Sequence, residues 1–583
     1  MPPIASIPAG PNRLRILVTS DNHVGYLEND PVRGDDSWKT FQETMRLAQI
    51  HDADMVVQGG DMFHVTRPSK KALFHVIQAL RLNCLGDRPC ELELLSDPAL
   101  ALRSGDSLNY EDPNLNVAVP VFAISGNHDD ATGSGLLSPL DVVAATGLVN
   151  YFGQIPRDDK ILLAPILLQK GTTRLALYGL NNLRDERLQR LMRDGKVTFQ
   201  KPRERFFSIL CLHQNHARHS ISSYVPEDFL PLFLDLVIWG HEHECILDPQ
   251  YNPATGFDTL QPGSTVATSL SEGETAPKHV FLVDVLGEEY SIKPIRLQTV
   301  RPFVMRDISL QREHFVEGPA LKRDIADFLV SQVEEMIEQA KQDEENEEQD
   351  ETHEKTSSEN MLPLIRLRVD HTGDYEVENA RRFSNRFVGR VANVNDILLY
   401  HQKKALRQPQ RKLAEPQARE PLNVLIQQLL QSVLGDSSLF LVAEDRIFDA
   451  TKKFIEQDDK EVLAEYVEKA VEDATKLLLQ IGIDEAEFHK GDTRKGFRQL
   501  LNQLRREAKR KPIDDESWQD SPKESVPEPE PVVLSEEDEP KKRAPRAKAA
   551  PKKATTTKPK AAPRRAKRTH DQSLLDDILS LGS

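Results

Sequence analysis

The chain has 583 residues, 39% of them hydrophobic, and a formal net charge of −17 at pH 7. This length is too great for one hydrophobic core, so we expect two or three folded units. No run of about 18 apolar residues occurs, so no membrane span is expected. The N-terminus lacks a charged region followed by an apolar stretch, so a secretory signal is not expected either.

Cysteines and charge narrow the class of protein further. The four cysteines are too few and too irregularly spaced for a disulfide framework or a zinc knuckle, which predicts reduced, buried thiols. Residues 541–568 contain thirteen Lys and Arg and no acidic residue. Taking these thirteen positive charges from −17 leaves −30 on the rest of the chain. A local basic segment can contact phosphate whatever the total charge, so nucleic acid is not excluded.

Residues 13–290 have the alternation of strand and helix signals that predicts an α/β domain. Short β-rich runs predict strands at Leu14–Thr19, Asp54–Gln58, Val119–Ser125, Arg174–Tyr178, Phe206–Leu212, Leu236–Trp239 and His279–Val285. The apolar spacing predicts helices from Ser37 to Ile50 and from Ser69 to Leu82.

Residues 291–410 predict a second, smaller domain, with a strand at Leu364–Val369 and a helix at Val377–Val388. It is interrupted by residues 334–354, which contain eleven acidic residues and one lysine. Because such a block repels itself, we expect either a solvated loop or the exposed end of a helix.

Residues 420–510 predict helices with one apolar side each. The apolar positions recur every three or four residues, at Leu422, Leu425, Leu429 and Val433 and at Leu463, Val467, Ala470, Ala474 and Leu477. The other sides carry little apolar surface. These helices either bind a partner or pack on their own globular domain, and the pattern leaves both open.

Residues 511–583 predict a disordered tail, acidic over 514–540 and basic over 541–568, because neither part can bury enough apolar area to fold. The basic part has three interpretations: nuclear import, DNA binding, or a solvated run with neither role. The candidate DNA-binding residues are Lys541, Lys542, Arg543, Arg564 and Arg565. Residues 573–581 form either a terminal helix or a frayed end.

Five short polar motifs follow apolar runs in the first domain. They are Asp21-Asn22-His23, Gly60-Asp61, Gly126-Asn127-His128-Asp129, His213 and Gly240-His241-Glu242-His243. Ligands in open α/β sheets bind at the carboxyl ends of strands, so these side chains should meet. Glycines before three of the motifs let the backbone turn closely around the site.

The motifs supply enough Asp, His and Asn side chains for two metal ions. Asp61 can bridge the ions because a carboxylate has two oxygens. We expect Asp21, His23 and His243 on one ion and Asn127, His213 and His241 on the other. Such mixed nitrogen and oxygen sites suit Mn²⁺, Fe or Zn²⁺. Two ions with a water between them hydrolyse phosphate esters.

Two further histidines have expected catalytic roles. His128 follows a ligand and is not needed as one, so we expect it to stabilise the transition state or protonate the leaving oxygen. His64 could help to position the phosphate or the residues behind the metals. The histidines outside the motifs, His51, His75, His216 and His279, are interpreted as ordinary, and Cys245 as a packed thiol.

Longer stretches resemble one family. They include RLAQIHDADMVVQGGDMFH, VFAISGNHDDATG, LHQNHARH, LVIWGHEHEC and QPGSTVATSL. They are similar to the eukaryotic meiotic-recombination-eleven nucleases of the calcineurin-like dinuclear metallophosphoesterase superfamily. The resemblance covers residues 13 to about 405, and weakly to about 510. It implies a four-layer α/β sandwich with a smaller α+β capping domain facing DNA, a helical partner-binding region and a disordered tail.

The same resemblance implies function and partners. The implied activities are Mn²⁺-dependent 3′-to-5′ exonuclease and single-strand endonuclease, with two Mn²⁺ ions, in double-strand-break repair and meiotic recombination in the nucleus. The implied partners are DNA ends and a second copy of the chain, bound through the helices near 37–50 and 69–82. No association with a membrane is expected. An SMC-like zinc-hook coiled-coil ATPase would bind at 420–510 and a nibrin-like subunit at 84–115.

Some residues depart from the family pattern. Asn22 stands where an apolar residue is common, and we expect its side chain to point away from the metals. Asn181-Asn182-Leu183 replaces a Gly-rich run near DNA. The tail carries Lys, Ala and Pro in place of Arg-Gly repeats. Two alternatives remain: a phosphoprotein phosphatase with the same metal centre, and a non-catalytic scaffold on the same fold.

Overall fold

The computed structural model describes residues 3–402, apart from short segments. Those segments are 103–106, 132–136, 156–159, 218–222, 314, 316–317, 348–360 and 374. The predicted helices of 420–510 and the whole tail, including its candidate DNA-binding residues, lie outside the described part. Among the residues that are described, no helix combines the length and the apolar character needed to cross a membrane.

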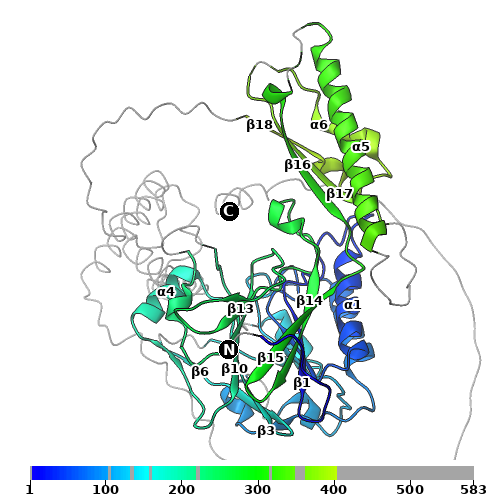
Figure 1. Ribbon diagram of the computed structural model, residues 1–583. Coiled ribbons are helices and arrows are strands. Elements are labelled where there is room, and N and C mark those ends of the chain that lie inside the picture. Colours follow the sequence, from blue (N-terminus) through cyan, green and yellow to red (C-terminus); the bar gives the residue numbers. More distant parts are fainter. Residues whose placement is uncertain are drawn as a thin grey trace, which may run out of the picture. The chain divides into compact units, whose positions relative to one another are not determined.

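Two β-sheets form the centre of the first domain (Figure 1). The first has the order β15 (Glu289–Arg296), β14 (His279–Leu286), β1 (Leu14–Thr19), β2 (Met55–Gln58), β4 (Val121–Ala123), β5 (Asn150–Tyr151). The second has the order β12 (Gln250–Tyr251), β13 (Asp258–Leu260), β11 (Leu236–Gly240), β10 (Phe207–His213), β8 (Thr173–Leu180), β7 (Ile166–Lys170), β3 (Glu93–Leu94). A separate small sheet pairs β6 (Ile161–Leu163) with β9 (Val197–Phe199).

The central strands of both sheets are parallel. In the first sheet β1 pairs with β2 and β2 with β4, and in the second β10 pairs with β8 and β11. Parallel neighbours end at the same edge of a sheet, so their carboxyl ends gather the residues that follow them. The strands that precede all five motifs belong to this parallel set.

Three apolar cores separate four layers. One core joins the first sheet to α1 (Asp36–Ile50), α2 (Lys70–Cys84) and α3 (Pro139–Ala144). A second core lies between the two sheets, and a third joins the second sheet to α4 (Asp185–Arg193). The expected four-layer sandwich is therefore confirmed.

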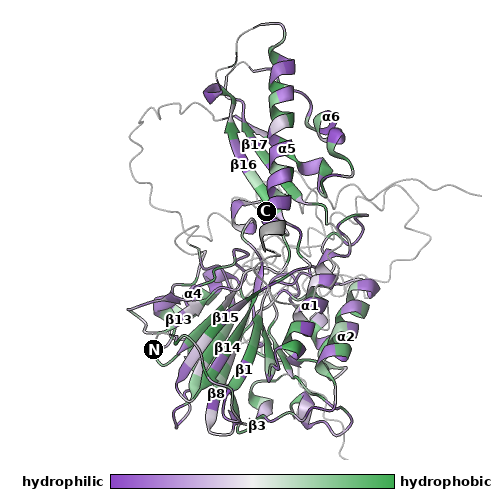
Figure 2. Ribbon diagram, turned by 45° about the vertical axis from the view of Figure 1, so that its right-hand side comes forward, coloured by the Kyte–Doolittle hydropathy of each residue, from purple (hydrophilic) through white to green (hydrophobic). Residues whose placement is uncertain are grey.

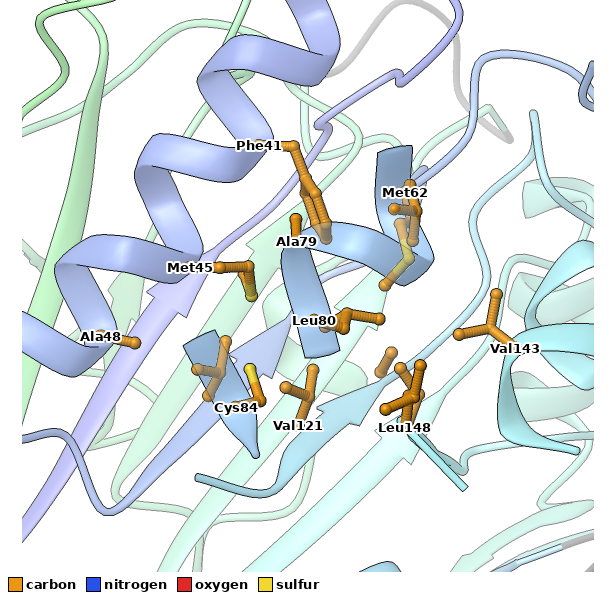
Figure 3. Close-up of a cluster of buried hydrophobic side chains, with 14 of the residues drawn as sticks. Phe41, Met45, Ala48, Met62, Ala79, Leu80, Cys84, Val121, Val143 and Leu148 are labelled. Carbon is orange, nitrogen blue, oxygen red and sulfur yellow. The ribbon is translucent and has the colours of Figure 1, made fainter. Parts of the chain in front are cut away.

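The helices α1 and α2 form where the apolar spacing predicts them. Phe41, Met45 and Ala48 recur at four and three residues, which places them on one face of α1. Figure 3 shows these side chains beside Leu80 and Cys84 of α2. At the start of α2 the Ser69 hydroxyl accepts a hydrogen bond from the backbone N–H of Ala72, which caps the helix.

The second domain has a three-stranded sheet of its own. It consists of β16 (Phe303–Ser309), β17 (Leu364–Asp370) and β18 (Leu398–His401), with α5 (Leu321–Glu347) and α6 (Ala380–Ser384). Side chains of α5, including Ile325, Leu329 and Val333, share a core with β17. In Figure 2 α5 carries both hydrophilic and hydrophobic residues, as an amphipathic helix should.

Three sequence predictions can be compared with the described elements here. The domain boundary predicted between residues 290 and 291 falls inside β15. The whole of β15 pairs with β14 in the first sheet. The helix predicted at Val377–Val388 is shorter, because Asn379 caps α6 and Asn385–Phe387 is a 3-10 turn. For the acidic block, residues 334–347 extend α5, so the helix alternative applies to them.

Candidate metal centre

The five motifs lie at or just after the carboxyl ends of β1, β2, β4, β10 and β11, and His213 is itself the last residue of β10. Four of their residues have the left-handed backbone that is uncommon outside glycine, with φ values of 49° at Asp21, 46° at His23, 53° at Asp61 and 85° at His241. Backbone hydrogen bonds join two of the loops, from Asp21 N to Gly60 O (3.0 Å) and from His23 N to Asp61 O (2.9 Å). The loops are held in an otherwise unfavourable conformation, as is common at functional sites.

The first expected ligand set is brought together. Asp21 Oδ1 lies 3.8 Å from His23 Nε2 and 3.6 Å from His243 Nε2. The two imidazole Nε2 atoms are 3.2 Å apart. Three ligand atoms therefore face one small volume.

The second expected set converges beside it. Asn127 Oδ1 lies 3.2 Å from His213 Nε2 and 3.0 Å from His241 Nδ1. Asp61 stands between the sets, because its Oδ2 is 3.4 Å from His213 Nε2 and 3.9 Å from His23 Nε2. All seven side chains expected as metal ligands thus meet in one place.

Two carboxylate oxygens lack partners within this cluster. Asp21 Oδ1 and Asp61 Oδ2 are buried and accept no hydrogen bond from any residue that the structure describes. The other oxygen of each carboxylate is bonded, Asp21 Oδ2 by the Ser20 hydroxyl (2.5 Å) and Asp61 Oδ1 by the backbone N–H of His128 (2.8 Å). A buried anionic oxygen without a donor is costly, and a cation would satisfy it. The donor set therefore fits divalent metal ions.

The electrostatics of His213 also favour a cation in this cluster. Burial by itself lowers the pKa of His213, but the carboxylates of Asp61 and Asp21 outweigh it and raise the pKa to about 10. Its Nδ1–H donates to the carbonyl oxygen of Gly59 (2.8 Å), which leaves Nε2 facing the carboxylates. The cluster attracts positive charge at the point where the metal ligands converge.

His128 and His64 lie next to the ligands. His128 Nδ1–H donates to the backbone carbonyl of His64 (2.8 Å), so its Nε2 is the ring nitrogen left for chemistry. The two rings stack, with centroids 4.9 Å apart and planes 20° apart. His23 meets His128 edge to face at 4.9 Å. Their ligand atoms and that of His23 lie within 4.8 Å of one another, so both candidates adjoin the first ligand set.

Sequence reasoning missed the residues behind two of the histidines. His243 Nδ1 lies 2.9 Å from Glu274 Oε1, and Glu274 pairs with the buried Lys278. His241 Nε2 lies 2.9 Å from Asn215 Oδ1. Glu274 stands in the 3-10 turn Glu272–Glu274 and Asn215 in the loop after β10; both lie outside the motifs, and no periodicity marks them.

The departures from the family pattern have structural roles. Asn22 is fully buried, and its amide donates to the hydroxyls of Thr19 (3.0 Å) and Thr265 (3.3 Å). It belongs to neither ligand set, as expected. Asn182 belongs to the stretch that replaces the family's Gly-rich run. Its amide donates to the carbonyl oxygen of His213 (3.0 Å) and so supports β10.

The residues interpreted as ordinary lie outside the ligand sets. His216 stacks on Trp239 with centroids 4.2 Å apart, and His75 stacks on Trp38 at 3.9 Å. All four cysteines are free thiols; Cys84, Cys211 and Cys245 are buried as predicted, whereas Cys90 is half-buried. Cys245 is buried in the core between the sheets, which confirms its interpretation as a packed thiol.

Comparison with known proteins identifies the two domains. Residues 14–245 match the family model of calcineurin-like phosphoesterases, and residues 290–454 match that of the Mre11 DNA-binding presumed domain. A solved structure of a dimetal phosphatase from Danio rerio aligns with a TM-score of 0.27 and 10% identity, over 49% of this chain and all of that one.

Two curated relatives align over most of the chain. The double-strand break repair protein mus-23 of Neurospora crassa is 45% identical over 490 residues, covering 81% of this chain and 66% of that protein. The human double-strand break repair protein MRE11 is 38% identical over 493 residues, covering 82% of this chain and 68% of its own length. The chain thus spans about two thirds of the relatives' length. It belongs to the Mre11 family, on a calcineurin-like metallophosphoesterase fold.

Proposed function

We propose that this chain is a DNA nuclease that hydrolyses phosphodiester bonds at a centre of two divalent metal ions. The observation that carries the proposal is the pair of buried carboxylate oxygens, Asp21 Oδ1 and Asp61 Oδ2. They accept no hydrogen bond within the described part of the chain and are surrounded by imidazole nitrogens. DNA as the substrate is supported by the names of the relatives and by the match of residues 290–454 to a DNA-binding family model.

Each residue has an assigned part. Asp21, His23 and His243 would hold one ion, Asn127, His213 and His241 the other, and Asp61 would bridge them. When bound, the two ions supply Lewis acidity that activates a water and neutralises charge on the phosphate. The protein supplies fixed positions, because every ligand stands at or just after the carboxyl end of a strand.

His128 is the proposed general acid. Its Nδ1–H is occupied by the carbonyl of His64, so Nε2 is the atom that would carry a proton to the leaving oxygen. His64 stacks on His128 and would keep that ring in place while contacting the phosphate. Burial lowers the pKa of His64, which favours its neutral form beside the ligands.

We further propose the finer properties of the enzyme. The cofactor would be Mn²⁺, and the activities 3′-to-5′ exonuclease and single-strand endonuclease, within a nuclear complex for double-strand-break repair and meiotic recombination. The chain would form a homodimer, bind a coiled-coil ATPase through 420–510 and bind a nibrin-like subunit through 84–115. Co-purification of a large coiled-coil ATPase from the source cell tests the partner assignment.

The substrate is tested by assaying one preparation with Mn²⁺ on a DNA duplex, on single-stranded DNA and on a phosphopeptide. We expect DNA cleavage that chelation abolishes and added Mn²⁺ restores. Hydrolysis of the phosphopeptide without DNA cleavage would favour a phosphatase. Metal binding without either reaction would favour a non-catalytic scaffold.

A further inference from the structure

His241 and His243 belong to one motif but receive different support. Each ring turns one nitrogen to the ligand cluster and the other to a residue from a distant loop. The partner on the far side fixes the tautomer of a metal-binding imidazole and tunes its basicity. The chemical nature of the two partners therefore bears on how the two metal positions differ.

The support of His243 is anionic. Glu274 Oε1 accepts from His243 Nδ1 (2.9 Å), and the hydroxyl of Thr268 lies 2.9 Å from the same nitrogen. The other oxygen, Oε2, accepts from Lys278 Nζ (2.5 Å) and from the Ser264 hydroxyl (2.9 Å). Glu274 and Lys278 are each 2% exposed. A carboxylate is thus held rigidly against the ring. Its countercharge, Lys278, lies on the other carboxylate oxygen and also donates to the backbone carbonyl of His243 (3.0 Å).

The support of His241 is neutral. Its Nε2–H donates to the amide oxygen of Asn215 (2.9 Å), and the Asn215 amide donates in turn to Asp185 (2.5 Å). An amide oxygen accepts this hydrogen bond without bringing a negative charge to the imidazole. The charge of Asp185 stands one residue further away.

The expected metal ligands also carry more negative charge on the side of His243 than on the side of His241. The set around His243 contains the terminal carboxylate Asp21, whereas the set around His241 contains the neutral amide of Asn127. Carboxylate ligands and a carboxylate behind a histidine both increase the affinity for a divalent cation. Both differences favour the position beside His243.

We propose that Glu274 is a positioning residue that makes the metal position of Asp21, His23 and His243 the tighter of the two, so that this position fills first. This inference rests on the proposed two-metal function. Asn215 has the corresponding place behind His241 and leaves that position weaker. The second ion then becomes the one whose binding switches the centre on.

The experiment is a Mn²⁺ titration of the metal-free full-length chain, followed by electron paramagnetic resonance and by measurement of bound metal. We expect one equivalent to bind at least about tenfold more tightly than the second, with the spectrum of an isolated ion preceding that of a coupled pair. The variant Glu274→Gln with Lys278→Met removes both buried charges and keeps an acceptor. It should weaken the first step roughly 10–100-fold and leave the second unchanged.

A reciprocal variant keeps the test independent of that substitution. Asn215→Asp with Asp185→Asn moves the carboxylate next to His241. This change should tighten binding of the second Mn²⁺ ion and so reduce the difference in affinity between the two ions, the gap. The inference is overturned if the folded Glu274 variant binds its first ion as the parent does, or if the Asn215 variant leaves the gap unchanged. Failure of the parent chain to bind two ions would instead overturn the proposed function.

Discussion

At the residue scale, the candidate metal centre depends on glycines. Because these residues lack a Cβ, the ligand side chains can pack directly against the backbone. A Cβ at Gly126 would lie 2.1 Å from Asp61 Oδ1 and 2.6 Å from His213 Nε2. A Cβ at Gly60 would lie 2.4 Å from His213 Nδ1, at a φ of +99°. The glycines that precede the ligands therefore set the distances between them.

The first prediction concerns this crowding. Gly126→Ala should displace Asp61 or His213 and lower Mn²⁺ affinity at least about tenfold, the size of effect that follows disturbance of a ligand's support. Gly86→Ala is the matched control, because its Cβ would meet only Ala118 Cβ at an ordinary 3.7 Å. Equilibrium dialysis with metal analysis measures both. Equal affinity in the two variants would mean that the site tolerates the shift.

The second prediction separates chemistry from metal binding. His128→Asn should abolish DNA cleavage while Mn²⁺ and DNA binding persist, because His128 is proposed to move a proton and not to hold a metal. Cleavage assays and binding measurements on the same preparation provide the comparison. Loss of metal together with activity would show that His128 is a ligand or a structural residue.

The sequence allowed prediction of the ligands but not of the residues behind them. Each of the seven expected ligands follows an apolar run in a short motif, so strand ends alone indicate that they meet. Glu274 lies 31 positions from His243 and Asn215 lies 26 positions from His241. Glu274 stands in a 3-10 turn and Asn215 in a loop, where neither period nor spacing predicts a contact. Local pattern predicts what a strand carries, but it does not predict which distant loop will cover it.

At the scale of elements, local sequence pattern predicts the long strands but not the shortest ones. The seven strands predicted in residues 13–290 all exist, because each is an apolar run buried on both faces of a layered fold. Strands of two residues, such as β3, β5 and β12, are too short to show any periodicity. They are recognised by their pairing with a neighbour, which is a tertiary property.

The third prediction concerns the loop after β10, where His216 links three elements. His216 stacks on Trp239 of β11, and its Nε2 lies 3.0 Å from Glu227 in the 3-10 turn Glu227–Phe229. Its Nδ1 lies 3.4 Å from Gln261 Oε1, and Glu242 adds a further negative charge nearby. Burial by itself lowers the pKa of His216, but the hydrogen bonds and charges outweigh it and raise the pKa above its ordinary value.

A raised pKa in the folded state has a definite consequence for stability. The contribution of charged His216 to stability should be complete below its unfolded-state pKa of about 6.5. This contribution should be lost as pH rises through the pKa that His216 has in the folded state. We expect His216→Gln to reduce the free energy of unfolding more at pH 6 than at pH 8.5, as measured by urea denaturation. A difference that is the same at both pH values would contradict a charged His216.

At the scale of the whole molecule, charge is divided between one short basic segment and the rest of the chain. Thirteen basic residues stand in 541–568, while the rest of the chain carries −30. Composition indicates this division directly, whereas the four layers were expected from family resemblance and not from composition. The arrangement of layers depends on which sheets share a core, and that is a long-range property of the fold.

The fourth prediction concerns the basic segment. If 541–568 contacts DNA, its deletion should weaken binding to all sequences and flatten the dependence of affinity on salt, because fewer counterions are released. Deletion of the acidic segment 514–540, of similar length, is the control and should not flatten it. Fluorescence anisotropy over a range of salt concentrations measures both slopes. An unchanged slope after deletion of 541–568 would leave nuclear import or no role.

The central claim is that the five motifs hold two metal ions side by side. The most direct measurement is anomalous X-ray scattering at the manganese edge from crystals of the chain grown with Mn²⁺. We predict two peaks about 3.5–4 Å apart, one among Asp21, His23 and His243, the other among Asn127, His213 and His241, with Asp61 between them. A single peak at saturating Mn²⁺, or peaks away from these residues, would contradict the account.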